Sequence, residues 1–181
     1  MIQRPGAGDA RVTASYRKAS GETVERVYTV KGNSRYTVDL SREVGTADVS
    51  TQVTSNVGVV CERSMYWNGR TAGHSTIGSP GPGRTWYLAE GCSDYGFETW
   101  VLLDNPSGAT VNATLTFMKE DGTTVPAVIG LKPHSRMSVN AATYVGAASF
   151  STKVSAATPI MVERSVYWNN RSGGTGSIGA R

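Results

Sequence analysis

The 181-residue sequence contains an internal duplication. The segment Glu62–Asn68, Glu-Arg-Ser-Met-Tyr-Trp-Asn, recurs at 163–169 with one change, Met65 to Val166. At an offset of about 101 residues the match runs without a gap from 10–78 onto 111–179, and about 26 of roughly 69 aligned positions are identical. A chain that carries one unit twice is expected to fold into two similar modules. The sequence therefore predicts a first repeat in residues 1–85 and a second in residues 86–181.

The composition favours strands over helices. Leu, Ile and Phe are scarce, whereas Val, Thr, Ser, Ala and the 21 Gly are abundant, which is typical of short strands joined by frequent turns. In the second repeat, apolar residues alternate between turn signals in seven segments: Trp86–Glu90, Phe97–Asp104, Val111–Lys119, Thr123–Leu131, Arg136–Asn140, Ser149–Ala156 and Ile160–Trp168. We therefore expect an all-β protein made of two tandem immunoglobulin-like antiparallel β-sandwiches.

The first repeat is incomplete at its N-terminal side. Pro5 aligns with Pro106, so the counterpart of Trp86–Thr99 would lie before Met1. The first repeat should then lack its first strand and most of its second, which would expose an apolar face and an unpaired edge. Three sources could cover them: residues upstream, the same segment of another copy, or Trp86–Asp104 folding back in a permuted frame.

An arginine interrupts the apolar face of the last predicted strand in both repeats. Alternation places Arg63 with Cys61, Met65 and Trp67, and the second repeat repeats the pattern around Arg164. A buried guanidinium needs a carboxylate or carbonyl partner and can stack on an aromatic ring. We expect a structural ion pair with an acid such as Glu90 and contact with Trp faces; a ligand-binding arginine is the alternative.

The two cysteines do not follow a zinc or redox motif. Cys61 aligns with Val162, whereas the counterpart of Cys92 would lie before Met1. A disulfide between Cys61 and Cys92 is the simplest pairing, and it would join the end of one repeat to the start of the next. Two buried free thiols are the alternative.

Aromatic, amide and guanidinium groups gather at the same strand end in both repeats. These candidate ligand-binding residues are Tyr66, Trp67, Arg70, Tyr167, Trp168 and Arg171. Such groups can stack on sugar rings and bond hydroxyls, although a Tyr-Trp pair more often closes a β-sandwich core. The glycine-rich segments that follow, 73–78 and 174–179, precede no helix and do not read as phosphate-binding loops.

No residue pattern points to catalysis. The two histidines, His74 and His134, align with Thr175 and Asn33, and no nucleophile elbow or zinc-type spacing accompanies them. Asp104 and Asp121 lie in turn-like segments, where Asp usually bonds its own backbone rather than Ca²⁺. We expect no catalytic residue, no metal and no cofactor.

Neither the charge nor the hydropathy of the sequence points to a nucleic-acid or membrane partner. The net charge is +4, but Lys and Arg are scattered, which argues against nucleic acid as a partner. No segment approaches the roughly 18 apolar residues of a membrane span, and the N-terminus lacks the apolar core of a secretory signal.

Several motifs resemble a tandem repeat of secreted and surface-exposed bacterial proteins, a family without an assigned biochemical function. They are Trp86–Gly91 (Trp-Tyr-Leu-Ala-Glu-Gly), Phe97–Pro106, Val162–Trp168, which contains Glu-Arg-Ser-x-Tyr-Trp, and Gly73–Gly78 (Gly-His-Ser-Thr-Ile-Gly). The resemblance covers nearly the whole chain and implies β-sandwich modules appended to larger extracellular proteins. It supplies no catalytic residue, and the second repeat departs from it at Thr175-Gly176.

The function expected from these observations is a non-enzymatic structural or assembly module of a bacterial cell-surface protein or filament. Its partners would be other copies of itself or neighbouring modules, and strand donation between subunits could complete the first repeat. A polysaccharide-binding module involved in adhesion, or an accessory module of a larger secreted enzyme, is the alternative.

Overall fold

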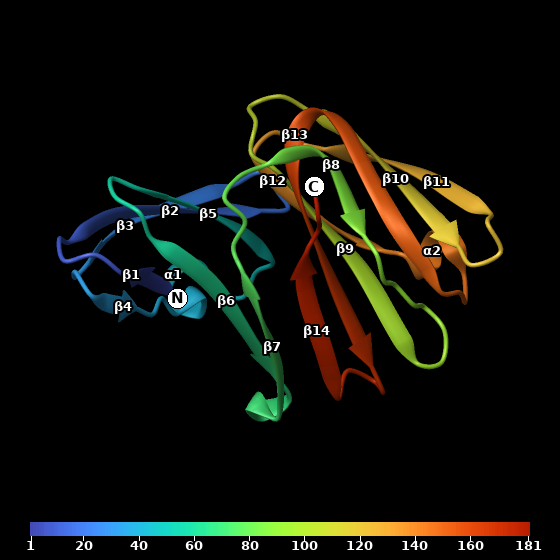
Figure 1. Ribbon diagram of the computed structural model, residues 1–181, viewed down its shortest axis with the longest axis horizontal. Coiled ribbons are helices and arrows are strands. Elements are labelled where there is room, and N and C mark those ends of the chain that lie inside the picture. The colour runs from blue at the N-terminus through green and yellow to red at the C-terminus, as the bar shows by residue number, and fades with distance from the viewer.

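The computed structural model describes residues 1–181 and is an all-β protein, as predicted. Strands hold 61% of the residues and helices 7%. The first repeat and the second repeat lie beside each other, with the N-terminus in the former and the C-terminus in the latter (Figure 1). Because few long apolar side chains are available, the chain stabilises itself with many short paired strands rather than with helices.

The second repeat contains all the strands predicted for it, with changed bounds. Its elements are β8 (Gly83–Leu88), β9 (Phe97–Asn105), β10 (Val111–Lys119), β11 (Thr124–Leu131), β12 (Ser135–Asn140), α2 (Ala142–Val145), β13 (Phe150–Trp168) and β14 (Gly173–Ile178). The last two predicted strands are one continuous strand, β13. Strand β8 begins at Gly83, three residues before the predicted start of the repeat.

Strand β13 belongs to two layers of the second repeat. Its first half pairs with β10 and β8 and its second half with β9 and β14, all antiparallel. The pairing shifts between Ser155 and Ile160, around Pro159, whose missing N–H cannot join a ladder. The two resulting layers, β11-β10-β13-β8 and β12-β9-β13-β14, enclose a core of 18 buried residues that includes Trp86, Leu103 and Phe117.

The first repeat has the same plan with fewer paired residues. Its elements are β1 (Ile2–Arg4), β2 (Ala10–Lys18), β3 (Thr23–Val30), β4 (Ser34–Tyr36), α1 (Leu40–Val44), β5 (Val49–Ser55), β6 (Val60–Trp67), a 3₁₀ turn (Asn68–Arg70) and β7 (Ala72–Ile77). They form two sheets, β3-β2-β5 and β4-β1-β6-β7. The connected cluster of buried apolar residues in this repeat has only four members, Ile2, Ala10, Val12 and Val30, and Ala14, Tyr16 and Ala72 are buried outside it.

The duplication is visible in the structure. Strands β2 and β10, β3 and β11, and β7 and β14 have bounds that differ by the same offset of about 101 residues. Turn positions match as well: Gly21 and Gly122 both have positive φ, as do Asn33 and His134. Asn and Gly tolerate this left-handed region most readily, so the repeated turns have a common backbone requirement.

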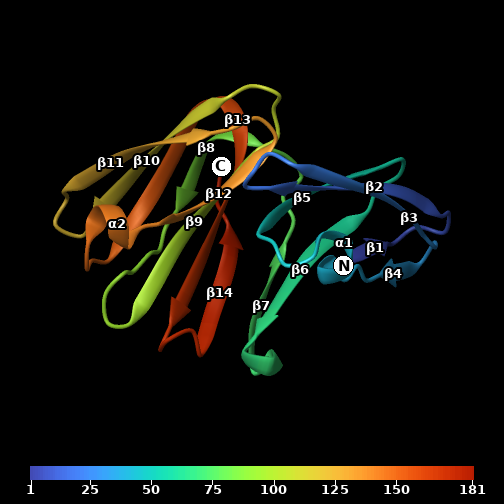
Figure 2. The ribbon, with the colours of Figure 1, turned by 180° about the vertical axis from the view of Figure 1, so that it is seen from behind.

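The two glycine-rich segments, which were not among the predicted strands, form β7 and β14. Strand β7 pairs with β6, and β14 pairs with β13. The hairpins β6–β7 and β13–β14 lie side by side in opposite views (Figures 1 and 2). The glycines matter here because a Cβ at Gly176 would lie 2.7 Å from the His74 ring, and one at Gly174 would lie 3.1 Å from the Trp67 ring. Glycine therefore allows the hairpins to pack closely.

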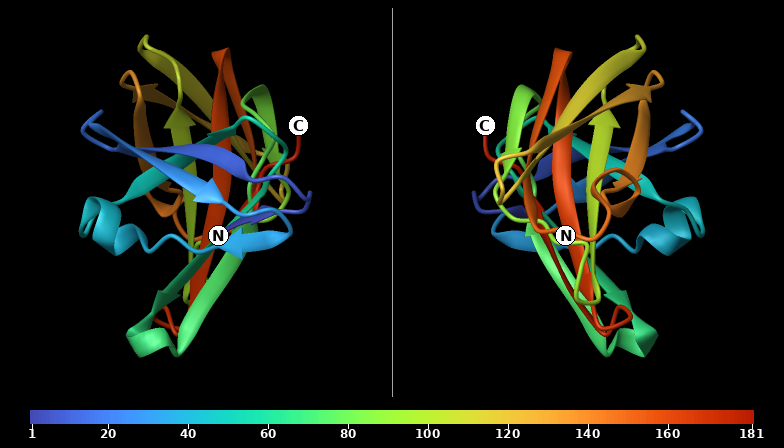
Figure 3. Two further views of the ribbon diagram at one scale, coloured as in Figure 1. Left: turned by 90° about the vertical axis from the view of Figure 1, so that its left-hand side faces the viewer. Right: turned by 90° about the vertical axis from the view of Figure 1, so that its right-hand side faces the viewer.

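The two repeats meet through unlike surfaces. Strands β6 and β7 pack on β13 and β14, with Arg63 and Trp67 of β6 against Glu163 and Tyr167 of β13, and β2 reaches β9 through Arg17 and Asp104. The side views show the two repeats in contact along these strands (Figure 3). The contact is therefore not a symmetric one between matching faces.

Candidate functional site

The open edge of the first repeat is the most unusual feature of the fold. Strand β5 pairs with β2 on one side and ends its sheet on the other. In the second repeat the equivalent side is occupied by β8, which pairs antiparallel with Thr152–Ser155 of β13. The equivalent residues of the first repeat, 51–54, therefore pair with β2 but have no strand on their other side. This is the side on which the sequence comparison expects the first repeat to lack a strand.

Most of the second strand is also absent from the first repeat. Strand β1 spans three residues, whereas β9, its counterpart, spans nine. Strands β8 and β9 both pair with β13 inside the second repeat, so the permuted frame, in which they fold back to complete the first repeat, is wrong.

Apolar side chains beside the open edge are only partly covered. Val53, Val59 and Cys61 are half-buried. Their equivalents in the second repeat, Val154, Ile160 and Val162, are all 0% exposed. We call the partly covered apolar surface beside β5 that is formed by Val53, Val59 and Cys61 the socket.

In the second repeat, Trp86 of β8 fills the equivalent space. It is 1% exposed, lies opposite Val154, and donates its indole N–H to the carbonyl oxygen of Ile160 at 2.9 Å. Leu88 of the same strand is 3% exposed. The socket is therefore what remains of this site when the β8 counterpart is absent.

The two predicted arginines have different partners. Arg164 Nη1 lies 2.6 Å from Glu90 Oε2, which confirms the expected ion pair, and it also donates to the Glu90 carbonyl oxygen at 2.5 Å. Arg63 instead pairs with Glu163 of the other repeat, with one Nη1–Oε2 distance of 3.1 Å. Burial raises the pKa of Glu163, and the Arg63 charge opposes that rise.

A contact between a guanidinium and aromatic rings, expected for Arg63 and Arg164, is instead formed by Arg171. The Arg171 guanidinium lies 5.4 Å from the centre of the Tyr167 ring and 6.0 Å from that of Trp100. The same guanidinium forms an ion pair with Glu98 at 2.7 Å, and that contact lowers the pKa of the carboxyl and raises that of the guanidinium.

The six candidate ligand-binding residues do not form one surface. Trp67 packs edge-on against Tyr167, with ring centres 5.5 Å apart, and its indole N–H donates to the Arg171 carbonyl oxygen at 2.6 Å. Trp168 packs against Phe97 instead. The remaining two, Tyr66 and Arg70, are exposed. Three of the six residues thus join the repeats to each other.

His74 is a contact residue that the sequence comparison missed. Its ring lies 5.6 Å from that of Trp67 and 6.2 Å from that of Tyr167. Both ring nitrogens are buried without a hydrogen-bond partner, and burial, together with the nearby Arg63, lowers the pKa of the imidazole. The repeat comparison could not single out His74, because it aligns with Thr175 and only the copy in the first repeat contacts the other repeat.

A buried ion pair between the repeats also has no counterpart in the duplicated sequence. Arg17 Nη1 lies 3.1 Å from Asp104 Oδ2, and both side chains are nearly inaccessible. Ser50 donates to the same carboxylate at 2.5 Å, and Arg136 pairs with Asp48 at 3.3 Å. Asp104, Arg136 and Glu163 therefore hold the first repeat on the outward face of the second.

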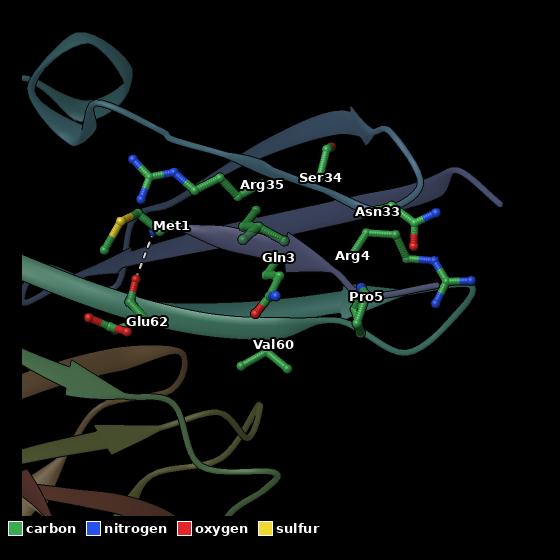
Figure 4. Close-up of a pocket in the computed structure, with 10 residues that line it drawn as sticks. Met1, Gln3, Arg4, Pro5, Asn33, Ser34, Arg35, Val60 and Glu62 are labelled. Carbon is green, nitrogen blue, oxygen red and sulfur yellow. Dashed lines mark hydrogen bonds between the residues drawn. The ribbon is translucent and has the colours of Figure 1, made fainter. Parts of the chain in front are cut away.

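The equivalent outward face of the first repeat is open. It forms a groove of about 710 Å³, shown in Figure 4, with Gln3, Arg35 and Glu62 at positions equivalent to Asp104, Arg136 and Glu163. The N-terminal amine lies at its edge and donates to the Glu62 carbonyl oxygen at 2.7 Å. Two of the three charged positions are kept in the first repeat, whereas Gln3 replaces an acid.

The predicted disulfide is wrong, because both cysteines are free. Cys61 lies on β6 opposite Ile2, at the core of the first repeat. Cys92 lies in the second repeat, where its backbone forms an isolated antiparallel β-bridge with Ser149. Each thiol is half-buried within a different repeat, and burial raises the pKa of Cys61.

The structure has no group of three or more His, Cys, Asp or Glu side chains placed to hold a metal ion. Neither of its helices is long and apolar enough to cross a membrane.

Comparison with known proteins identifies a fold but no family. No family model matches the chain, and no curated protein matches it. Among solved structures, "Crystal Structure of Thermotoga maritima 1070" matches with a TM-score of 0.50 and 18% identity, over 56% of this chain and 96% of that one. "Anabaena sensory rhodopsin transducer" matches with a TM-score of 0.42 and 17% identity, over 46% of this chain and 95% of that one. The part of this chain that matches the first structure, 56% of its length, is about as long as one repeat. Neither match establishes a family for this chain.

Proposed function

We propose that this chain is a non-enzymatic structural module of a bacterial surface protein or filament, joined to its neighbours through the first repeat. The observation that carries the proposal is the unpaired edge of β5 beside the socket. An edge of this kind presents free N–H and C=O groups to any extended segment that approaches.

The apolar residues beside the edge add a driving force. Val53, Val59 and Cys61 are half-buried, whereas their equivalents are fully buried. Burying a fully exposed side chain of this size stabilises a protein by about 1.5–3 kcal/mol, and completing the burial of a half-buried one gives a part of that. A strand that covers the socket would gain both this burial and the ladder hydrogen bonds.

The groove on the outward face of the first repeat supports an arrangement of more than two modules. The equivalent face of the second repeat binds the first repeat through ion pairs of Asp104, Arg136 and Glu163. In the first repeat, Arg35 and Glu62 are kept at two of those positions and are exposed. A further module placed on this face would continue the same stacking.

The resemblance to repeats of secreted bacterial proteins supports the location that we propose, outside the cell or at its surface. Neighbouring modules or other copies of the chain are the partners that this role requires. The polysaccharide-binding alternative gains no support from Trp67, Tyr167 and Arg171, because these residues pack between the repeats.

Size-exclusion chromatography with light scattering tests the proposal. At rising concentration the 19.2 kDa chain should associate into larger species, because nothing covers the open edge. Thr51→Lys places a charge beside the socket, at a position that is exposed in the first repeat and 2% exposed at its equivalent, Thr152. This variant should remain a monomer.

Thr29→Lys is the matched control, because Thr29 is an exposed threonine on β3, the opposite edge of the same sheet. It should associate like the unmodified chain. A chain that stays monomeric at all concentrations, or a turnover reaction catalysed by the purified protein, would contradict the proposed role.

A further inference from the structure

We infer that the contact between the hairpins β6–β7 and β13–β14 is an acid-sensitive joint. When the imidazole of His74 takes up a proton, the two hairpins separate, while each repeat keeps its own strands. This inference is independent of the proposed function, which concerns the edge of β5 and the outward face of the first repeat.

His74 lies at the centre of this contact. Its ring is 5.6 Å from that of Trp67 on β6 and 6.2 Å from that of Tyr167 on β13, and the last two rings are 5.5 Å apart. The imidazole therefore packs against aromatic rings of both repeats. A change in the charge of His74 acts directly on the contact between them.

The backbone of β14 lies directly against the imidazole. A Cβ atom at Gly176 would lie 2.7 Å from the nearest ring atom of His74 and 2.9 Å from its Nδ1 atom. A real Cβ atom does not come that close to another atom, so glycine is needed at this position. Water reaches this side of the ring only when the hairpins move apart.

The imidazole has no hydrogen-bond partner in the closed contact. Both ring nitrogens of His74 are buried without one, and so is the hydroxyl oxygen of Thr76, which is also close to Gly176. A neutral imidazole leaves one N–H donor unpaired, whereas an imidazolium leaves two and adds a charge that a hydroxyl does not neutralise. Burial of an uncompensated charge costs far more free energy than burial of an unpaired N–H, so protonation favours the separated, hydrated state.

The carboxylates around the contact are already paired with guanidinium groups. The charged groups that surround the imidazole form the pairs Arg63–Glu163, Arg136–Asp48 and Arg171–Glu98. Arg63 lies on β6, which pairs with the strand of His74, and its charge opposes a second positive charge. Strand β13 adds the Tyr167 phenol, and β14 carries no titratable side chain. No carboxylate of this set is free to pair with an imidazolium.

The pH dependence of the joint has a definite sign. Burial and the Arg63 charge lower the pKa of His74 from its ordinary value of 6.5. The separated state therefore binds more protons, and the closed contact, which is stable above about pH 6.5, weakens as the pH falls. One proton shifts this equilibrium by at most about tenfold per pH unit. Burial raises the pKa of Glu163, so its titration acts in the opposite direction.

Other connections between the repeats contain no histidine. They are the ion pairs Arg17–Asp104 and Arg136–Asp48 and the segment 79–82, Ser-Pro-Gly-Pro, which links β7 to β8. These connections hold the repeats together when the hairpins separate. The joint therefore opens at the hairpins without dissociation of the two repeats.

The distance between two nitroxide labels tests the inference. Thr71→Cys and Ser172→Cys place the labels on exposed, equivalent residues in the turns of the two hairpins, in a parent chain that also carries Cys61→Val and Cys92→Ser. An excess of unlabelled chain ensures that pulsed electron spin resonance measures only distances within one chain. We expect a single distance at pH 8 and a second, longer distance at pH 5.

His74→Phe is the matched variant, because it keeps an aromatic ring against Trp67 and Tyr167 but cannot take up a proton. It should show only the shorter distance at both pH values. His134→Asn removes the other histidine, which is exposed, and introduces the residue found at the equivalent position, 33. Its labels should separate at pH 5 like those of the parent chain.

Nuclear magnetic resonance gives a second measurement that does not depend on a change at His74. In His134→Asn the signals of a single imidazole remain, and they should titrate with the same midpoint as the fraction of the longer distance. Two clearly different midpoints would show that another group controls the joint.

An unchanged label distance in the parent chain between pH 8 and pH 5 overturns the inference. An equal increase in His74→Phe also contradicts it, since the proton would then act elsewhere. Circular dichroism distinguishes separation of the hairpins from unfolding. The strand signal of the parent chain should be the same at both pH values, and its loss at pH 5 would mean that acid unfolds the repeats instead of opening the joint.

Discussion

Arg63 of the first repeat forms its ion pair with Glu163 of the second repeat, although the equivalent Arg164 pairs with Glu90 close to its own β8. The position equivalent to Glu90 would precede Met1, and no such acid lies beside Arg63 in the structure. A carboxylate from the outward face of the neighbouring repeat therefore takes its place, and one duplicated arginine has two different structural roles.

Glu163→Gln should destabilise the chain by about 2 kcal/mol, because it removes the charge opposite a largely buried guanidinium. Glu62→Gln changes the equivalent residue, which is exposed, and should alter stability by less than about 0.5 kcal/mol. Urea unfolding of both variants checks the difference. Equal losses would show that the Arg63–Glu163 contact does not hold the repeats together.

Asp104→Asn should cost about 3 kcal/mol or more, because it leaves the buried Arg17 guanidinium without its counter-charge. The double variant Arg17→Met, Asp104→Leu replaces the pair by apolar residues, Met being the residue at the equivalent position, 118. It should recover much of the loss in urea unfolding. A double variant as unstable as Asp104→Asn would mean that the pair is not the source of the effect.

Trp86→Ala should destabilise the second repeat by about 3–5 kcal/mol, since it empties the centre of the larger core. Tyr87→Ala is the control on the same strand, at a position that is 48% exposed. Its effect should be clearly smaller. Thermal unfolding followed by circular dichroism distinguishes the two variants. Similar losses of stability would mean that β8 stabilises the repeat through its backbone hydrogen bonds rather than through the Trp86 side chain.

Acid should weaken the contact at His74. Burial lowers the pKa of this imidazole, so between that lowered value and the ordinary value of 6.5 the unfolded chain binds more protons than the folded chain. Stability is therefore present above about pH 6.5 and is lost as the pH falls below it. His74→Thr introduces the residue found at the equivalent position, 175, and removes this dependence.

Unfolding free energies at pH 8 and pH 5 measure the effect. The unmodified chain should lose more stability than His74→Thr over this interval. Glu163 has a raised pKa and an opposite pH dependence, but it is present in both proteins and largely cancels in their difference. Equal losses would show that His74 does not stay neutral in the folded state.

Both thiols should react in unfolded protein with a reagent for free sulfhydryl groups, without prior reduction. In folded protein Cys61 should react more slowly than an exposed thiol, because its pKa is raised by burial. Reductant should leave the melting temperature unchanged. A drop in melting temperature on reduction would indicate the disulfide that the structure lacks.

The duplication made much of the fold predictable. The ungapped match placed the turns at Gly21 and Gly122, and it showed that the first repeat lacks a counterpart of β8. The Arg164–Glu90 pair was also predictable, because both residues belong to one repeat and a buried guanidinium requires an acid.

Contacts between the repeats were not predictable in the same way. Arg17 aligns with Met118 and His74 with Thr175, so the comparison of the repeats gave no reason to single them out. Strand β14 was missed because glycine carries no side chain to show alternation, although its backbone pairs with β13. Close packing between hairpins selects glycine there, and that selection depends on a partner distant in sequence.

The continuity of β13 has a mechanical consequence. This strand is bonded to β8, β9, β10 and β14, so tension along it is shared by both layers of the second repeat. The first repeat divides the same length into β5, which has one neighbouring strand, and β6, which has two. A stretched chain would therefore yield first in the first repeat, and a segment bound along β5 would raise the force at which it gives way.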